Sequence, residues 1–175
     1  RLLALIVARN AMREQPAPAL LQRVSRHNGN TPGRPGVRTM SFDPQQRFVH
    51  LAEDGRATEL PGGDAFWSLP AAEMAAYDTG WLVIEFECSE DWPNWERHPE
   101  GDEYVYLLSG AVQLLLERPS GLQTLELKGR GAVLVPRGIW HTARVSAPSR
   151  LLHITRGLGS EHRPVHAEAV SRPGG

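Results

Sequence analysis

The chain has 175 residues and a mass of 19.4 kDa, enough for one domain with a short appendage. Hydrophobic residues make up 41% and charged residues 22%, which excludes a chain that is disordered throughout. The longest unbroken apolar run, residues 2–8, is far shorter than the ~20 residues that cross a bilayer, and the single Cys88 excludes an intrachain disulfide and a thiolate zinc site.

The net charge of −1 conceals two unlike segments. Residues 1–39 contain seven Arg and one Glu, a balance of +6, whereas residues 40–175 contain 12 basic and 19 acidic residues, a balance of −7. An acidic main segment does not suit a protein whose main task is nucleic-acid binding. We therefore expect neither nucleic acid nor a membrane as a partner, and we expect a cytoplasmic location.

Residues 1–39 show no periodicity, and residues 28–36 are dense in turn-forming residues, which indicates a linker. The composition changes at Met40, which resembles a natural start. We predict a flexible or non-native Arg-rich arm over residues 1–39, although a secretory signal, an organelle transit peptide and a phosphate-binding tail stay open. We expect a folded domain over residues 40–160 and a loose tail over residues 161–175.

Short apolar segments dominate the chain after residue 80, and turn-forming residues separate them. One helical turn or two is expected over residues 71–76, after Pro70. Strands are expected over residues 81–86, 103–108, 111–117, 122–127, 132–135, 142–145 and 151–155. Such short, closely spaced runs predict an all-β, single-domain protein and leave a β-meander, a sandwich and a barrel open.

Metal-ligand residue types gather in one of these segments. Glu96 and His98 are two residues apart, so they point to the same face of an extended strand. Glu103 opens the next strand, and His141 opens another after the turn at residues 136–138. If these side chains face one interior, two imidazoles and one carboxylate suit Fe(II), Mn(II) or Zn(II), with Glu96 as a fourth ligand or a general base.

The two segments resemble the paired motifs of the cupin superfamily, G(X)5HXH(X)3-4E(X)6G and G(X)5PXG(X)2H(X)3N. The matching residues are His98, Glu103 and Gly110 in the first motif, and Pro136, Gly138 and His141 in the second. The resemblance covers roughly residues 81–155. It implies a single antiparallel β-barrel of the double-stranded β-helix, jelly-roll-like type, and metal ligands at His98, Glu103 and His141.

The sequence departs from these motifs at three positions. Glu96 replaces the first histidine, Val145 replaces the closing asparagine, and Arg130 stands where the second motif begins with glycine. Glu96 is therefore a metal ligand only by analogy. The resulting set of two carboxylates and two imidazoles is formally −2, which favours harder divalent metals such as Mn or Fe.

The resemblance implies a mononuclear divalent metal (Fe, Mn, Zn or Ni) and a small organic molecule as ligand or substrate. We expect oxygenase-type chemistry, dioxygenases included, or isomerase-type chemistry, with Glu96 as the catalytic residue that takes or relays a proton. The alternative is a non-catalytic binding or sensor protein, with a metal-free barrel as one form of it.

Three further interpretations concern residues near these motifs. Tyr104 and Tyr106 should face outward, which predicts a sheet-to-sheet contact or a contact between two copies in a homodimer. His153 should face the interior, more as structural filler than as a ligand. His162 is discounted because Pro164 lies between it and His166.

Overall fold

The structure, a computed structural model, describes residues 41–157 and 159–165. The predicted arm over residues 1–39 lies outside the described residues, as does the predicted tail from residue 166 onward. The helices of the described part are short: α1 (Asp64–Trp67), α2 (Ala71–Met74) and the 3₁₀ helix η1 (Ala75–Tyr77). The second and third cover the predicted helical segment.

Strands make up most of the described part, as predicted. They are β1 (Arg47–Leu51), β2 (Ala57–Pro61), β3 (Trp81–Cys88), β4 (Asn94–Arg97), β5 (Glu103–Arg118), β6 (Gly121–Lys128), β7 (Gly131–Val135), β8 (His141–Thr155) and β9 (Glu161–Pro164). All their pairings are antiparallel. The all-β, antiparallel prediction is therefore confirmed.

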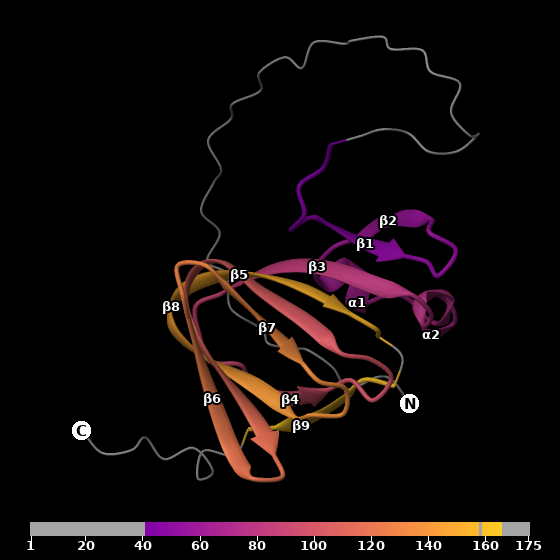
Figure 1. The fold of residues 1–175 in the computed structure, drawn as a ribbon. Helices are drawn as coiled ribbons and strands as arrows, with labels where there is room; N and C mark the ends of the chain where they lie inside the picture. The colour runs from indigo at the N-terminus through magenta and orange to yellow at the C-terminus, as the bar shows by residue number, and fades with distance from the viewer. Residues whose placement is uncertain (1–40, 158, 166–175) are drawn as a thin grey trace, which may run out of the picture. The chain divides into compact units, whose positions relative to one another are not determined.

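The two longest strands, β5 and β8, hold the sheet together. They pair with each other, β8 also pairs with β3 and β4, and β5 also pairs with β6 and β7. The long strands curve, so that β4 and β9 lie across from β3 and β7 and the strands surround a common interior (Figure 1). This arrangement brings Glu96 of β4 close to Glu103 and His141, the first residues of β5 and β8.

The strand β5 is continuous, although two separate strands were predicted at Gly110. The register between β5 and β8 shifts from Leu107 to Val112, and Gly110 has a φ of 96°. A side chain at Gly110 would collide with the backbone of Pro148 and Ser149 in β8. Gly110 therefore bends the strand instead of ending it, because only glycine takes this conformation without strain in so close a contact.

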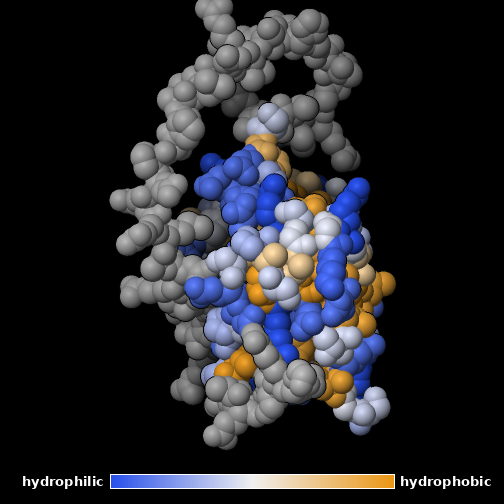
Figure 2. Space-filling view, turned by 90° about the vertical axis from the view of Figure 1, so that its left-hand side faces the viewer, coloured by the Kyte–Doolittle hydropathy of each residue, from blue (hydrophilic) through white to orange (hydrophobic). Residues whose placement is uncertain are grey.

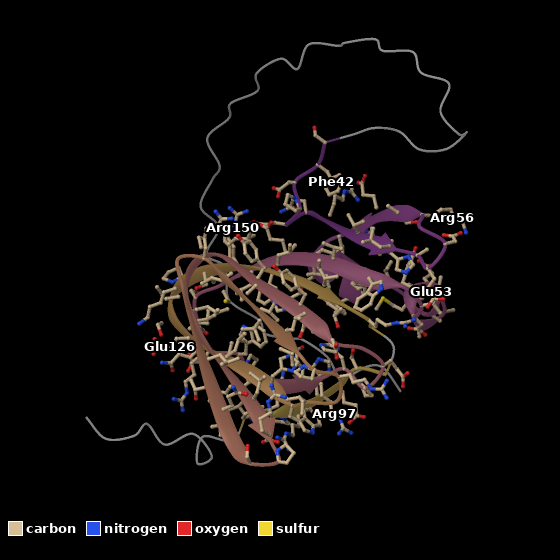
Figure 3. All side chains as sticks on the ribbon, viewed as in Figure 1. Phe42, Glu53, Arg56, Arg97, Glu126 and Arg150 are labelled. Atoms are coloured by element: carbon tan, nitrogen blue, oxygen red, sulfur yellow. The ribbon has the colours of Figure 1, made fainter. Side chains whose placement is uncertain are left out.

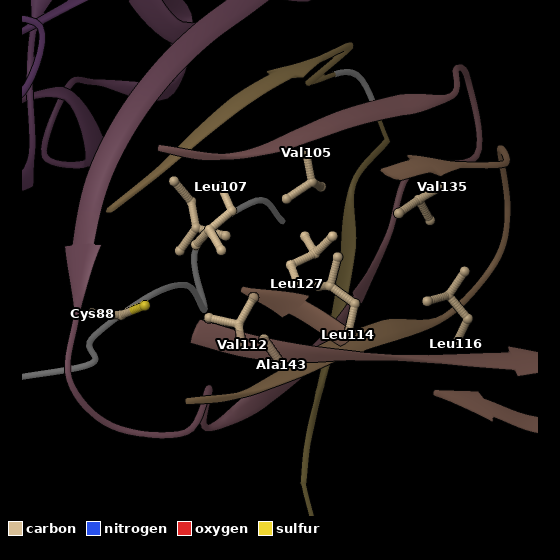
Figure 4. Close-up of a cluster of buried hydrophobic side chains, with 10 residues drawn as sticks. Cys88, Val105, Leu107, Val112, Leu114, Leu116, Leu127, Val135 and Ala143 are labelled. Carbon is tan, nitrogen blue, oxygen red and sulfur yellow. The ribbon is translucent and has the colours of Figure 1, made fainter. Parts of the chain in front are cut away.

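Alternation along β5 places its side chains as the sequence predicts. Glu103, Val105 and Leu107 are buried, whereas Tyr104 and Tyr106 lie on the outer face, with their rings stacked 6.3 Å apart. The main core consists of inward-facing side chains: Cys88, Val105, Leu107, Val112, Leu114, Leu116, Leu127, Val135, Ala143 and Leu151. These side chains point into the space between the strands (Figure 4). A second core joins Phe48 and Phe66, from β1 and α1, to Leu82 and Ile84 of β3.

The chain beyond residue 160 differs from the loose tail expected there. Glu161–Pro164 form β9, which pairs with β4 from Asn94 to Arg97. Pro164 is tolerated because it is the last residue of an edge strand, where its missing N–H leaves no ladder bond unmade.

On the face drawn in Figure 2, the described residues are mostly hydrophilic, with smaller hydrophobic areas between them. No helix within residues 41–157 and 159–165 has the length and apolar character needed to cross a membrane.

Candidate metal centre

Four side chains predicted as a metal site converge inside the sheet. Glu96, His98, Glu103 and His141 each offer one ligand atom, and these atoms all lie within 4.8 Å of one another. Glu96 belongs to β4, His98 follows that strand, and Glu103 and His141 begin β5 and β8. The structure thus brings together residues that are up to 45 positions apart in the sequence.

Backbone contacts between the two motif segments fix this arrangement. Glu96 and His141 are paired across β4 and β8. The N–H of Gly138, in the turn before β8, donates to the carbonyl of His98 over 2.9 Å. The N–H of Arg137 donates to the Asp102 carboxylate over 2.8 Å, which anchors the same turn beside β5. The turn at Pro136–Gly138 therefore positions both histidines.

Three of the four side chains of the centre are deeply buried. His141 is 0% exposed, Glu103 2% and His98 7%, whereas the Glu96 side chain is 19% exposed. Oε2 of Glu103 lies 2.7 Å from Nε2 of His141 and 3.4 Å from Nε2 of His98. Oε1 of Glu96 lies 3.3 Å from the same His141 nitrogen. The centre is most accessible on the side of Glu96.

Hydrogen bonds at the far side of each imidazole determine which nitrogen faces the centre as an acceptor. Nδ1 of His141 lies 3.1 Å from the carbonyl oxygen of Ile139, which can only accept, so this Nδ1 carries a hydrogen. Ser160 Oγ donates to the carbonyl of Gly157 over 3.0 Å, and it therefore accepts from Nδ1 of His98 over 2.8 Å. In the neutral imidazoles, both Nε2 atoms present a lone pair to the centre.

Three buried atoms at the centre make no hydrogen bond of acceptable geometry: Nε2 of His98, Nε2 of His141 and Oε2 of Glu103. All three are acceptors when the imidazoles are neutral, and they face one another. Buried polar atoms without a partner are costly, and converging acceptors require a cation between them, either a proton or a metal ion. Nitrogen and carboxylate oxygen are the donor types that Fe, Mn, Zn and Ni accept. The residues therefore fit a divalent metal.

The pKa shifts of the ionisable groups also indicate that the centre is stabilised by positive charge. Burial alone raises the pKa of Glu96, but the imidazoles of His141 and His162 outweigh this effect and lower it to about 2. Burial likewise raises the pKa of Glu103, and the surrounding histidines lower it well below its usual range. For His141, burial lowers the pKa, but the two carboxylates outweigh burial and raise it to about 10. The metal-free centre therefore holds a proton at pH 7, on His141.

His153 lies behind Glu103, on the side away from the other two histidines. Its Nδ1 is 2.7 Å from Oε1 of Glu103, so Oε2 is the carboxylate oxygen left for the centre. The His153 ring also stacks on Phe86, with ring centroids 4.9 Å apart, and lies near Trp92. The predicted inward direction is confirmed. Its contact with Glu103 goes beyond the packing role expected.

His162 is the residue that sequence reasoning missed. It stands opposite Glu96 in the β4–β9 pairing, and its Nε2 lies 3.4 Å from Oε2 of Glu96. His162 and His166, four residues apart, share a face only on a helix, and Pro164 between them argues against a helix. The His-x-Pro pattern also suits an edge strand, and recognising β9 would have placed His162 beside β4.

Comparisons with known proteins concern the fold. No protein-family model and no curated protein matches this sequence. A cupin-2 domain protein from Shewanella frigidimarina has 16% identity and a TM-score of 0.38, over 43% of this chain and 70% of that chain. Hydroquinone 1,2-dioxygenase, solved with Cd²⁺ and 4-hydroxybenzonitrile, has 18% identity and a TM-score of 0.39, over 45% and 59%. Hydroxypropylphosphonic acid epoxidase from S. wedmorenis, solved with fosfomycin, has 13% identity and a TM-score of 0.37, over 43% of each chain.

What decides the fold is found in this chain itself. Its two motif segments face each other inside a curved antiparallel sheet, at the positions that the motifs imply. The chain has a cupin fold. The cupin fold hosts many activities, so the function has to come from the residues of the centre.

Proposed function

We propose that this cupin binds one divalent transition-metal ion through His98, Glu103, His141 and Glu96. The single observation that supports it is the set of three buried acceptor atoms that face one another without a hydrogen bond. A bound ion would satisfy all three at once. We further propose that the protein is an enzyme that acts on a small organic molecule, by oxygenase- or isomerase-type chemistry.

The chain's own residues would divide the work as follows. When bound, the metal would supply Lewis acidity and, if it is iron, one-electron redox chemistry. His98 and His141 hold their Nε2 atoms toward the centre, because Ser160 and Ile139 accept from the opposite nitrogens. Glu96 contacts the buried His141 on one side and the partly exposed His162 on the other. It is the member placed to move a proton between the interior and the surface.

A second function, non-catalytic binding of the metal or of a metabolite, is favoured by one observation. The interior of the sheet holds a cluster of buried leucine and valine side chains, part of it contributed by the same strand as Glu103 (Figure 4). If Glu96 coordinates as well, the four protein ligands leave fewer positions for a substrate, and none on a tetrahedral ion such as zinc. The number of exchangeable waters on the bound metal distinguishes the two functions. Water-proton relaxation with Mn(II) measures that number: an enzyme keeps at least one such water, and a closed binding site keeps none.

Elemental analysis of the chain, purified without chelator, tests metal binding. We expect near-stoichiometric Fe, Mn, Zn or Ni, and a sharp loss in His98→Ala and His141→Ala. His50→Ala is the matched control, because His50 is equally buried but bonds to the carbonyl of Thr79, outside the centre. A wild-type chain that holds no metal, even after Fe(II), Mn(II) and Zn(II) are added back, would overturn the proposal.

We also propose that the chain forms a homodimer through the outer face of β5 and β7. Tyr104 and Leu134 are paired across these strands, and Leu134 is 67% exposed. Light scattering after size exclusion should give twice the chain mass, and Leu134→Lys should give the monomer mass. A wild-type monomer would contradict this.

A further inference from the structure

One short segment outside the two motifs contacts two of the four residues of the centre. We call Ser160–Arg163 the outer strap. Ser160 Oγ accepts from Nδ1 of His98, and Nε2 of His162 lies 3.4 Å from Oε2 of Glu96. Both contacts are made to the side of the residue that faces away from the centre. The strap therefore holds the rear of a histidine and of a carboxylate at the same time.

Contacts of the strap outside the centre keep it in place. The Arg97 guanidinium binds both carboxylate oxygens of Glu161, over 3.0 and 2.8 Å. Arg163 lies over the ring of Trp140, 4.5 Å from its centroid, and over Trp95 at 5.4 Å. Arg97 stands on the outer side of β4, pointing away from the interior (Figure 3). The side chains that make these contacts alternate with Glu96 and His162 along the two strands. Those that hold the strap in place therefore lie on one face of the β4–β9 pair, and Glu96 and His162 lie on the other.

The contact with His162 decides how Glu96 can be used. Glu96 has two oxygens, of which Oε1 faces Nε2 of His141 and Oε2 faces His162. With Oε2 held by an imidazole N–H, Oε1 is the oxygen directed at the centre. Without His162, nothing in the described part of the chain holds Oε2, and the side chain of Glu96 is already 19% exposed. Rotation toward solvent would then remove it from the centre.

We propose that His162 is a positioning residue that makes Glu96 a ligand of the metal. This inference rests on the proposed metal site. It adds that His162 determines how many protein side chains coordinate the metal. With the His162 contact the metal would have four protein ligands, and without it three.

A double-mutant cycle with Co(II) tests this inference on the full-length chain. Co(II) affinity is measured by competition with a chelator, and the visible spectrum of bound Co(II) reports its coordination. We expect His162→Ala to weaken Co(II) binding about tenfold, the lower end of the effect of losing an outer partner of a ligand. The spectrum should move to that of Glu96→Ala. His162→Gln keeps an N–H donor and should restore most of the affinity, and His50→Ala should not change it.

The decisive comparison is made in the Glu96→Ala background. A residue that acts only through Glu96 has no further effect once Glu96 is gone, so His162→Ala should then cost nothing more. An equal loss in both backgrounds, or no loss in the wild-type background, would overturn the inference while leaving the metal site intact. A wild-type chain that binds no Co(II) would instead overturn the proposed function, and this inference with it. If His162→Ala does not fold, His162→Leu removes the donor at similar volume and is compared with His162→Gln in the same way.

Discussion

Because the metal-free centre holds a proton, the free energy of unfolding of the chain should fall as the pH rises. In the folded chain the pKa of His141 is raised to about 10, against 6.5 for a free histidine. The folded state therefore binds a proton that the unfolded state has released. This stabilising contribution is complete below pH 6.5 and is lost as the pH rises toward 10. Glu96 and Glu103 stay ionised throughout this range, because the pKa of each is lowered.

The expected size follows from the linkage slope of about 1.4 kcal/mol per pH unit for one proton. The measurement runs from pH 6.5 to pH 8.5. At pH 6.5 the unfolded-state histidine is still partly protonated, so the slope is smaller there than at higher pH. The free energy of unfolding of the chelated chain should therefore fall by about 2 kcal/mol from His141 alone. His98, whose pKa is also raised, changes the stability in the same direction. The window ends at pH 8.5 because burial raises the pKa of Cys88, which adds a similar slope at higher pH.

Urea unfolding with chelator, at several pH values in this window, measures the effect. His141→Gln is the control, since it keeps a polar side chain and loses the proton, and it should lose most of the slope. A metal-loaded chain should also lose the slope, because the ion takes the place of the proton. A flat profile in the chelated wild type, or the same slope in His141→Gln, would refute the reasoning about the centre's charge.

Three further predictions concern metal removal and packing. Metal at 100 times its Kd should stabilise the chain by about 2.7 kcal/mol. Chelation should therefore lower the melting temperature of the wild type by several degrees and leave that of His98→Ala unchanged, and calorimetry measures the melting temperature of each. Leu114→Ala, at a side chain that is 0% exposed in the main core, should cost about 2–5 kcal/mol in urea unfolding, and a smaller loss would mean that the core collapses around the gap. Gly110→Ala should cost about 1–3 kcal/mol, because its φ of 96° and its contact with β8 exclude a Cβ; a neutral result would show that the bend relaxes.

The sequence was most informative where side chains alternate over a long run. The β5 pattern placed Glu103 inside and Tyr104 outside correctly, because one face of that strand is buried and a shift by one residue would reverse it. Spacing within the motifs was equally informative for His98 and His141, which the fold brings together. Both patterns are local in the sequence. Local patterns predict the structure correctly where burial of one face fixes the direction of the side chains.

The sequence was least informative where a distant strand supplies the contact. Separate strands were predicted on the two sides of Gly110 and on the two sides of residues 146–150. The strands β5 and β8 instead run through both places, and Gly110 and Pro148 lie where these two long strands bend past each other. The strand β9 was missed because it has only four residues, and its pairing with β4 is fixed by Arg97, Glu161 and the tryptophans. None of these contacts follows from spacing along the chain, and His162 was missed along with them.

Charge balance explains what the glutamate at position 96 contributes. Glu96 and Glu103 bring two ionised carboxylates into one buried cluster, and such charges are stable there only when they are compensated. In the metal-free chain, the proton on His141 compensates part of this charge. One divalent ion supplies two positive charges at one point and leaves the imidazoles neutral, as ligands must be. A histidine at position 96 would halve the negative charge of the ligand set. We therefore expect Glu96, held by His162, to favour a divalent ion with a preference for oxygen ligands, such as Mn or Fe, over softer metals.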